Sequence, residues 1–533
     1  MIMINDNSYI VIKNGLVADG TGSPLKRCDL EINGDKIINI GLIEPREGAI
    51  VVDATGLIVA PGFIDIHSHS DFLWLLHPES NSKVYDGVTT EICGNCGSSP
   101  FPIKGALLEH RKRGFGGLGL EIGWETSSEF FQLARSTPSS MNRGFLVGHG
   151  NLRACCIGYE NRAASREEIE YMKRELSNAM DEGAFGLTSG IAYPPGCFAT
   201  ANEIIELSHV VKEFNAVYAT HIRNEGDTLL DSLKEAINIA RKTDVKLQIS
   251  HLKTAGEKNW IKLNQVKDLL NNARSDGIKL HCDRYPYTAS STDLDSIFPK
   301  WVYEGGIEDE IKRLKDYSIR KKIRKELVYD NTCDREFWQR IVISSVLHES
   351  NKSIEGQNVY DIAINRKKDP FETVCDLLIE EDARVDALFF NMSEKNLEEI
   401  LKWEFVMVGS DSSVKSTEGV LNIGKPHPRS YGTFSRLIGI YCRKKKVLTL
   451  EEAIYKMTGA PATNIGLEKR GFLKSGYYAD IVIFDLEKIV DRSEFNNPHK
   501  YSDGINYVIV NGKLTLVNGQ HMGTMAGTVL QRK

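Results

Sequence analysis

The stretch that decides the fold is Val59-Ala-Pro-Gly-Phe-Ile-Asp-Ile-His67-Ser-His69-Ser-Asp71. Its apolar part, residues 63–66, predicts a short buried strand that ends in two histidines. Residues two apart in a strand point to the same side, so both imidazoles could converge on one metal ion where the strand leaves the core. Such a pair is as often structural as ligating, so the rest of the chain has to decide between the two interpretations.

Seven more strand-like segments follow the first, and segments with helical periodicity lie between them. Residues 165–180, which open with Ser165, and residues 227–242, for which Asp227 is the expected N-cap, are examples of these helices. Alternating strands and helices of this kind predict a (β/α)₈ TIM-type barrel, in the α/β class. Its eight strands are expected at 63–69, 89–93, 144–149, 184–189, 217–222, 246–252, 279–285 and 405–411.

Both ends of the chain consist of short strands and tight turns, with Asn-Gly pairs at 14–15, 33–34, 511–512 and 518–519. We therefore expect a composite β-sandwich domain from residues 1–61 and 467–533, around a barrel at 62–466. The barrel rhythm breaks at about 292–345, between strands seven and eight. This interval predicts an inserted helical subdomain, which is either a lid over the site or a decorative or oligomer-contact element.

Catalytic groups of a barrel lie at the C-terminal ends of its strands. His67 and His69 end strand one, Cys96 follows strand two, and His221 and His251 end strands five and six; Asp411 ends strand eight. Cys96 is preferred to Cys93 because it lies in the glycine-flanked turn beyond the strand. Imidazoles beside a thiolate suit zinc and exclude magnesium and calcium, so the pattern predicts a zinc site.

Composition excludes several other classes of protein. The chain of 533 residues is 41% hydrophobic and 26% charged with a net charge of −6, which is ordinary for a soluble globular protein and offers no basic surface for nucleic acid. It has neither an apolar run of about 20 residues nor a secretory signal pattern, so we expect no membrane partner. Ten dilute cysteines fit free thiols in a reducing cytoplasm. A homo-oligomer stays open.

Together these motifs resemble the amidohydrolase superfamily. Many of its members bridge two metals with a lysine of strand four, but that strand, Gly183-Ala-Phe-Gly-Leu-Thr-Ser-Gly190, has none. Gly94-Asn-Cys-Gly-Ser-Ser-Pro100 instead resembles the N-acyl-D-amino-acid deacylase (D-aminoacylase) branch, in which a cysteine takes this role. The resemblance spans nearly the whole chain and includes Val147-Gly-His-Gly-Asn-Leu-Arg153, Asp283-Arg-Tyr-Pro-Tyr287, Gly409-Ser-Asp411 and His427-Pro-Arg429.

The resemblance implies a role for each of these rim residues. Cys96, His221 and His251 would hold a tight zinc ion, and His67, His69 and Asp411 would form a second, weaker site. Asp411 would also be the catalytic acid–base. The substrate would be a small N-acyl-D-amino acid, with its carboxylate held by Lys253, Tyr285, Ser291 and Arg429.

This sequence departs from the branch after strand eight. The branch usually has glycine after Ser-Asp411, but here Ser412 follows, and the loop to His427 is longer than usual. The acyl-group and side-chain preferences therefore stay open.

Two other functions compete with a deacylase. A cyclic-amide hydrolase of the dihydropyrimidinase or dihydroorotase type is disfavoured by the absent strand-four lysine. A catalytically silent scaffold is disfavoured because every expected ligand is in place. The sequence thus predicts zinc-dependent hydrolysis of the linear amide of N-acyl-D-amino acids.

Overall fold

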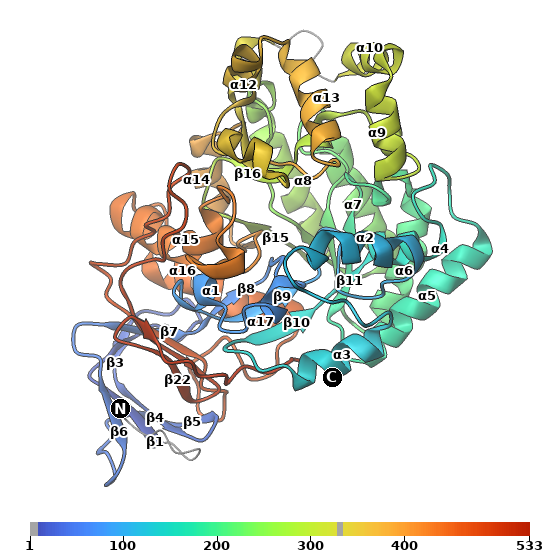
Figure 1. The fold of residues 1–533 in the computed structure, drawn as a ribbon. Coiled ribbons are helices and arrows are strands. Elements are labelled where there is room, and N and C mark those ends of the chain that lie inside the picture. Colours follow the sequence, from blue (N-terminus) through green and yellow to red (C-terminus); the bar gives the residue numbers. More distant parts are fainter. Residues whose placement is uncertain (1–8, 328–333, 533) are drawn as a thin grey trace.

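A closed barrel of parallel strands forms the centre of the molecule (Figure 1). The computed structural model describes residues 9–327 and 334–532. The predicted (β/α)₈ barrel is confirmed, and each expected strand segment contains a strand. The barrel strands are β8 (Phe63–Asp65), β9 (Val88–Cys93), β10 (Asn142–Phe145) with β11 (Val147–Gly148), β12 (Gly186–Gly190), β13 (Val217–His221), β14 (Lys246–Ile249), β15 (Leu280–Arg284) and β19 (Val406–Val408).

Two local features close the barrel. Strand three is interrupted at Leu146, so β10 pairs with β9 while β11 pairs with β12. Strand eight returns to strand one through a parallel bridge between Ser68 and Ser412, and the N–H of Asp411 donates to the carbonyl of His67 over 2.7 Å. Strands one and eight, which carry three of the predicted site residues, therefore meet at their C-terminal ends.

The helices of the outer ring begin where the sequence places polar caps. Ser165 caps α5 (Arg166–Asp181) in a capping box with Glu168, because each side chain accepts from the backbone N–H of the other. Helix α7 (Leu229–Thr243) buries Leu229, Leu233 and Ala236 against the barrel, but its N-cap is Thr228 and not the expected Asp227. Other barrel helices are α4 (His149–Cys156), α6 (Ala201–Glu213), α8 (Leu263–Ser275), α14 (Glu394–Lys402), α15 (Arg429–Arg436), α16 (Leu450–Met457) and α17 (Gly459–Ile465).

A two-sheet domain built from both ends of the chain packs beside the barrel (Figure 1). Its four-stranded sheet is β5 (Lys36–Gly41), β4 (Asp29–Asn33), β1 (Tyr9–Lys13) and β6 (Ile50–Asp53). Its seven-stranded sheet joins β7 (Ile58–Pro61), β2 (Leu16–Val17) and β3 (Lys26–Arg27) to β20 (Ile481–Phe484), β21 (Ile505–Val510), β22 (Lys513–Val517) and β23 (Gln520–His521). β7 pairs with β20, so strands from the two ends share one sheet.

The end of the chain differs from the predicted domain bounds. The sandwich was expected to include residues 467–533, of which residue 533, like residues 1–8 at the other end, lies outside the described residues. From Gly527 the chain instead runs along the N-terminal ends of barrel strands: the N–H of Gly527 donates to Ser139, that of Leu530 to Arg143 and that of Arg532 to Gly183. Because of these main-chain hydrogen bonds, residues 527–532 pack against the barrel and not in the sandwich.

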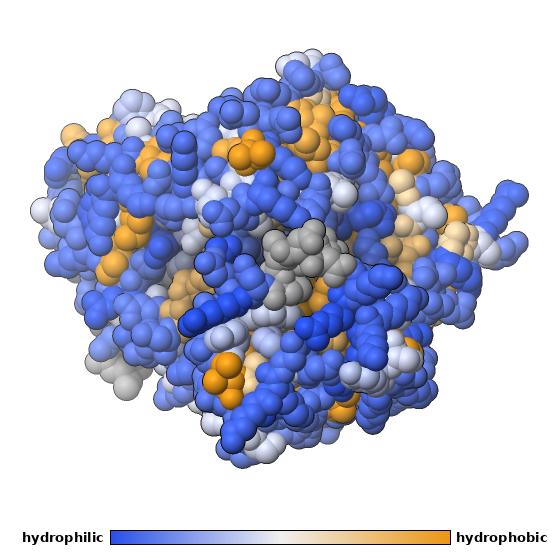
Figure 2. Space-filling model, turned by 90° about the horizontal axis from the view of Figure 1, so that it is seen from above, coloured by the Kyte–Doolittle hydropathy of each residue, from blue (hydrophilic) through white to orange (hydrophobic). Residues whose placement is uncertain are grey.

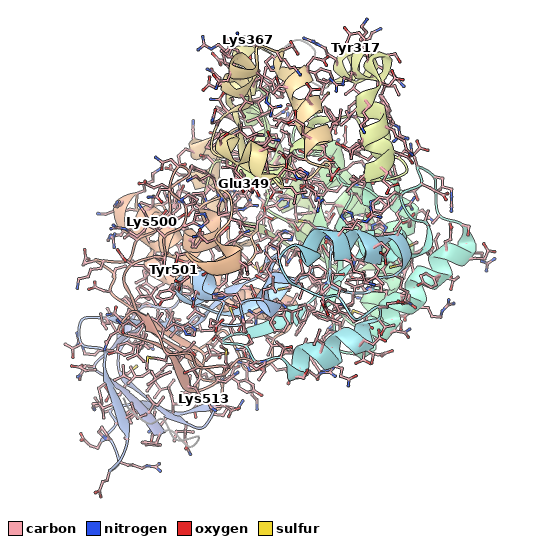
Figure 3. The ribbon with its side chains drawn as sticks, in the orientation of Figure 1. Tyr317, Glu349, Lys367, Lys500, Tyr501 and Lys513 are labelled. Carbon is pink, nitrogen blue, oxygen red and sulfur yellow. The ribbon has the colours of Figure 1, made fainter. Side chains whose placement is uncertain are left out.

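The insertion between strands seven and eight is larger than the predicted interval of about 292–345. Three antiparallel strands form its sheet in the order β16 (Ser290–Asp293), β18 (Asp386–Phe389) and β17 (Ile341–Ser345), so the unit extends to Phe389. Its helices are α9 (Ile307–Lys315), α10 (Tyr317–Glu326), α11 (Arg335–Gln339), α12 (Val359–Arg366) and α13 (Pro370–Glu380). They form the outer end of the molecule, where Tyr317 and Lys367 are labelled (Figure 3).

The outer face above this insertion is mostly hydrophilic, with small separate apolar patches (Figure 2). Within the described ranges, the structure contains no helix with the length and apolar composition needed to cross a bilayer. The nine cysteines among the described residues are all free thiols.

Candidate metal centre

The rim of the barrel brings all six predicted metal-site residues together. Within the part of the chain that the structure describes, ligand atoms cluster in two groups, each spanning at most 4.8 Å. The thiolate sulfur of Cys96 belongs to both groups. One group consists of Cys96, His221 and His251, and the other of His67, His69, Cys96 and Asp411.

Three of these residues have a left-handed backbone conformation. Cys96, His251 and Asp411 have φ angles of 52°, 35° and 51°. This left-handed region is costly for residues other than glycine, and such strain concentrates at functional sites. The surrounding chain enforces the conformation of Cys96: a Cβ on Gly97 would lie 2.5 Å from the N of Gly190, at the end of β12, so only glycine fits there.

The thiol of Cys96 lies among imidazoles. Its Sγ is 3.3 Å from Nε2 of His67 and 3.4 Å from Nε2 of His251. Burial alone would raise the pKa of this thiol, but the two imidazoles overcome that effect and hold the pKa well below its ordinary value. Cys96 therefore presents a thiolate, which is the form that binds metal.

Each of two histidines has a carboxylate behind it. Nδ1 of His67 lies 2.9 Å from Oδ1 of Asp283, and Nδ1 of His251 lies 2.9 Å from Oε1 of Glu225. A carboxylate on Nδ1 favours the tautomer in which Nε2 keeps its lone pair, and Nε2 is the atom that faces Cys96 in both residues. Nδ1 of the buried His221 has no hydrogen-bond partner among the described residues.

Asp411 connects the two histidines of strand one to a guanidinium. Its Oδ1 lies 3.1 Å from Nε2 of His69 and 3.3 Å from Nε2 of His67, while its Oδ2 lies 2.8 Å from Nη1 of Arg429. Burial raises the pKa of this carboxyl, but Arg429 and the imidazoles lower it well below its usual range. The group is thus a carboxylate at neutral pH.

The four predicted substrate-binding residues differ in their contacts, and Arg429 pairs directly with Asp411. The guanidinium of Arg429 stacks over the buried ring of Tyr285, 4.5 Å from its centroid, and Nη2 donates to the carbonyl of Ser291 over 3.4 Å. The hydroxyl of Tyr285 and Nε of Arg429 have no hydrogen-bond partner among the described residues. Lys253 is already engaged: its ammonium donates to Glu225 and lies 2.8 Å from Nδ1 of His251.

The donor set fits zinc. Neutral imidazole nitrogens and a thiolate are the ligands that zinc takes in proteins, while magnesium and calcium require oxygen-rich sites. Cys96, His221 and His251 give three such donors within 4.8 Å and would hold a zinc ion.

Two carboxylates of the site were not assigned a role from the sequence. Asp283 belongs to a quoted motif, and its position two residues before Tyr285, near the end of a strand, is the signal that could have marked it. Glu225 stands four residues after His221 in His221-Ile-Arg-Asn-Glu225, and this spacing is only a weak indication that Glu225 lies near the site.

Comparison with known proteins finds relatives over the whole length of the chain. A model of the amidohydrolase family matches residues 50–189 and 406–516. The D-aminoacylase of Alcaligenes xylosoxydans xylosoxydans is 33% identical over 532 residues, which cover 98% of this chain and 97% of that protein. The N-acyl-D-aspartate deacylase of the same organism is 32% identical over 505 residues, covering 94% and 91% of the two chains.

A solved structure gives the same result. The N-acyl-D-glutamate deacylase of Bordetella bronchiseptica, complexed with zinc and a phosphonate inhibitor that mimics the tetrahedral intermediate of its reaction, superposes with a TM-score of 0.83. It is 30% identical, and the match covers 99% of this chain and 100% of that one.

Proposed function

The chain belongs to the amidohydrolase family, in its D-aminoacylase branch, and on this premise we propose that it hydrolyses the amide bond of N-acyl-D-amino acids with the help of zinc. The products are a carboxylic acid and a free D-amino acid. One observation carries the proposal: Cys96 lies within 4.8 Å of both His221 and His251 at the catalytic rim of the barrel. The proposed zinc ligands are Cys96, His221 and His251, and the proposed second, weaker site adds His67, His69 and Asp411.

The proposed zinc ligands and Asp411 have different roles in the hydrolysis. A zinc ion held by Cys96, His221 and His251 would lower the pKa of a water molecule to roughly 7 and would polarise the amide carbonyl. Asp411 takes a proton from the water that attacks the carbonyl carbon. It then delivers that proton to the amide nitrogen as the C–N bond breaks. Its position between His69 and Arg429 holds the carboxylate at the rim for both transfers.

Arg429 is the proposed clamp for the carboxylate of the substrate. A guanidinium offers two parallel N–H groups to a carboxylate, and Nε of Arg429 and the hydroxyl of Tyr285, which have no hydrogen-bond partner in the described part of the chain, are donors that a ligand could satisfy. Ser291 stands next to this pair through its contact with Arg429. Lys253 contributes an N–H that Glu225 does not use, because an ammonium has three.

The rival functions are less well supported. A cyclic-amide hydrolase is disfavoured because strand β12, at 186–190, contains no lysine. A silent scaffold is disfavoured because all six rim groups converge. The free thiols among the described residues support our proposal that the enzyme works in the cytoplasm. We propose neither a nucleic-acid nor a membrane partner.

Zinc content and activity on matched substrates test the proposal. We expect the purified protein to hold zinc and to hydrolyse N-acetyl-D-methionine or N-acetyl-D-glutamate, but not the L-isomers. The variant Cys96→Ala should keep its circular dichroism spectrum, lose zinc and lose this activity. Hydrolysis of hydantoin or dihydrouracil alone would favour the cyclic-amide rival, and a zinc-free, inactive wild type would favour the scaffold.

A further inference from the structure

Glu225 touches two groups that the proposed reaction needs, yet it takes no part in the steps described above. It lies in the loop after β13, four residues beyond His221, and only 16% of its side chain is exposed. Its Oε1 lies 2.9 Å from Nδ1 of His251 and accepts a hydrogen bond from the ammonium of Lys253. Its Oε2 lies 3.9 Å from Nε2 of His221.

The loop holds this carboxylate in place. The carbonyl of Glu225 accepts the N–H of Ala255 over 2.8 Å, which ties the loop to the chain beyond β14. Oδ1 of Asn224 accepts the N–H groups of Gly226 and Thr228, each over 3.0 Å. The ammonium of Lys253 donates to Oε1, so the carboxylate is paired with a cation as well as with the ring of His251.

Lys253 and Glu225 favour different protonation states of Nδ1 of His251. Nζ of Lys253 lies 2.8 Å from Nδ1 of His251. If Lys253 donates to Nδ1, the ring proton of neutral His251 must sit on Nε2, which lies 3.4 Å from Sγ of Cys96 and then has no lone pair for a metal. If the N–H at Nδ1 donates to Glu225, Nε2 keeps its lone pair.

We propose that Glu225 is a positioning residue: it accepts both the Nδ1–H of His251 and an N–H of Lys253, and so keeps His251 in the tautomer that can bind zinc. One carboxylate thereby links a proposed metal ligand to a proposed substrate-binding residue. The inference rests on the proposed zinc site, but not on the identity of the substrate.

Three variants and a control separate this role from a general structural one. Zinc affinity is measured by chelator competition from the zinc-loaded protein, with circular dichroism to verify folding. Glu225→Ala should lower the affinity by roughly 10- to 100-fold, as loss of a partner behind a ligand does. Lys253→Ala leaves Glu225 in place as the acceptor of the Nδ1–H, so it should lower the affinity by much less than Glu225→Ala does.

The double variant is the decisive one. With both side chains gone, Lys253 no longer donates to Nδ1, so Glu225→Ala/Lys253→Ala should bind zinc more tightly than Glu225→Ala does, but less tightly than the wild type. The control is Asp231→Asn, whose exposed wild-type carboxylate pairs with Lys234 on the outer side of α7; it should bind zinc as the wild type does. An unchanged affinity in Glu225→Ala, or a double variant as weak as that single variant, would overturn the inference.

Nitrogen NMR of the zinc-free protein with labelled histidine, recorded at a pH at which His251 is neutral, gives a readout that needs no activity. We expect the proton of His251 on Nδ1 in the wild type and on Nε2 in Glu225→Ala. A wild type that binds zinc and shows this change but does not cleave N-acyl-D-amino acids would refute the proposed substrate and keep the inference. A wild type that cleaves N-acyl-D-amino acids, together with a Glu225→Ala variant whose tautomer and zinc affinity are unchanged, would refute the inference and keep the proposed substrate.

Discussion

Replacement of Asp411 by asparagine should separate the chemical step from substrate binding. Asparagine keeps the size and one acceptor oxygen of the side chain but cannot take a proton from water. Loss of a general base costs about 10²- to 10⁴-fold in rate, or roughly 3–5 kcal/mol of barrier. We therefore expect kcat of Asp411→Asn to fall by this factor on the best N-acetyl-D-amino acid.

The Michaelis constant should move in the opposite direction. In the wild type Oδ2 of Asp411 lies 2.8 Å from Nη1 of Arg429, so it competes with the substrate carboxylate for the guanidinium. Hydrogen bonds to charged groups are worth about 1.5–3 kcal/mol, and asparagine gives up part of this contact, so KM should fall by about two- to tenfold. Zinc at Cys96, His221 and His251 should stay bound.

Steady-state kinetics and metal analysis on the same preparations test both effects. Asp276→Asn, which changes an exposed carboxylate paired with Arg241 on the outer helices, is the matched control and should behave as the wild type. A kcat within tenfold of the wild type would show that Asp411 is not the proton carrier. A lost zinc ion would show that Asp411 acts through the metal.

Three further predictions concern the clamp, a buried ion pair and a buried lysine. Arg429→Lys loses the planar two-pronged donor, so KM should rise by about tenfold with little change in kcat; an unchanged KM would place the substrate carboxylate elsewhere. Lys83→Met removes the partner of fully buried Asp65, 2.7 Å away, and should lower the free energy of unfolding by about 3–5 kcal/mol in urea titrations, whereas a loss below about 1 kcal/mol would contradict the pair's role. Burial lowers the pKa of Lys456 from 10.5 to about 8, so between these pH values the unfolded chain binds more protons and stability should rise with pH. The difference in urea midpoint between the wild type and Lys456→Met should therefore shift in favour of the wild type from pH 8 to 10.5, and a constant difference would refute this sign.

The barrel could be predicted because its signals are local. Each strand is a short apolar run followed by a polar group, and Ser165 marks the start of α5 through the capping box with Glu168. The ends of parallel strands meet at one rim, so the order of strands alone placed His67, His221 and Asp411 close together.

The insertion was underestimated because its sheet is assembled from distant segments. β18 consists of four residues, and it becomes recognisable as a strand only through its partners β16 and β17, which lie more than 40 residues earlier in the chain. The role of Glu225 was missed for a related reason. A glutamate in a loop is ordinarily solvated, and only the folded chain shows that His251 and Lys253 lie against it.

The shared sheet of the two chain ends constrains the order of events during synthesis. β7 leaves the ribosome early, but its neighbour β20 begins about 400 residues later. At typical elongation rates of about 5–20 residues per second, the edge of β7 stays open for roughly 20–80 seconds. Throughout that time the nascent chain offers an unpaired apolar edge to any other strand, so a chaperone that shields the first 61 residues should raise the yield of native protein more than one that acts after release.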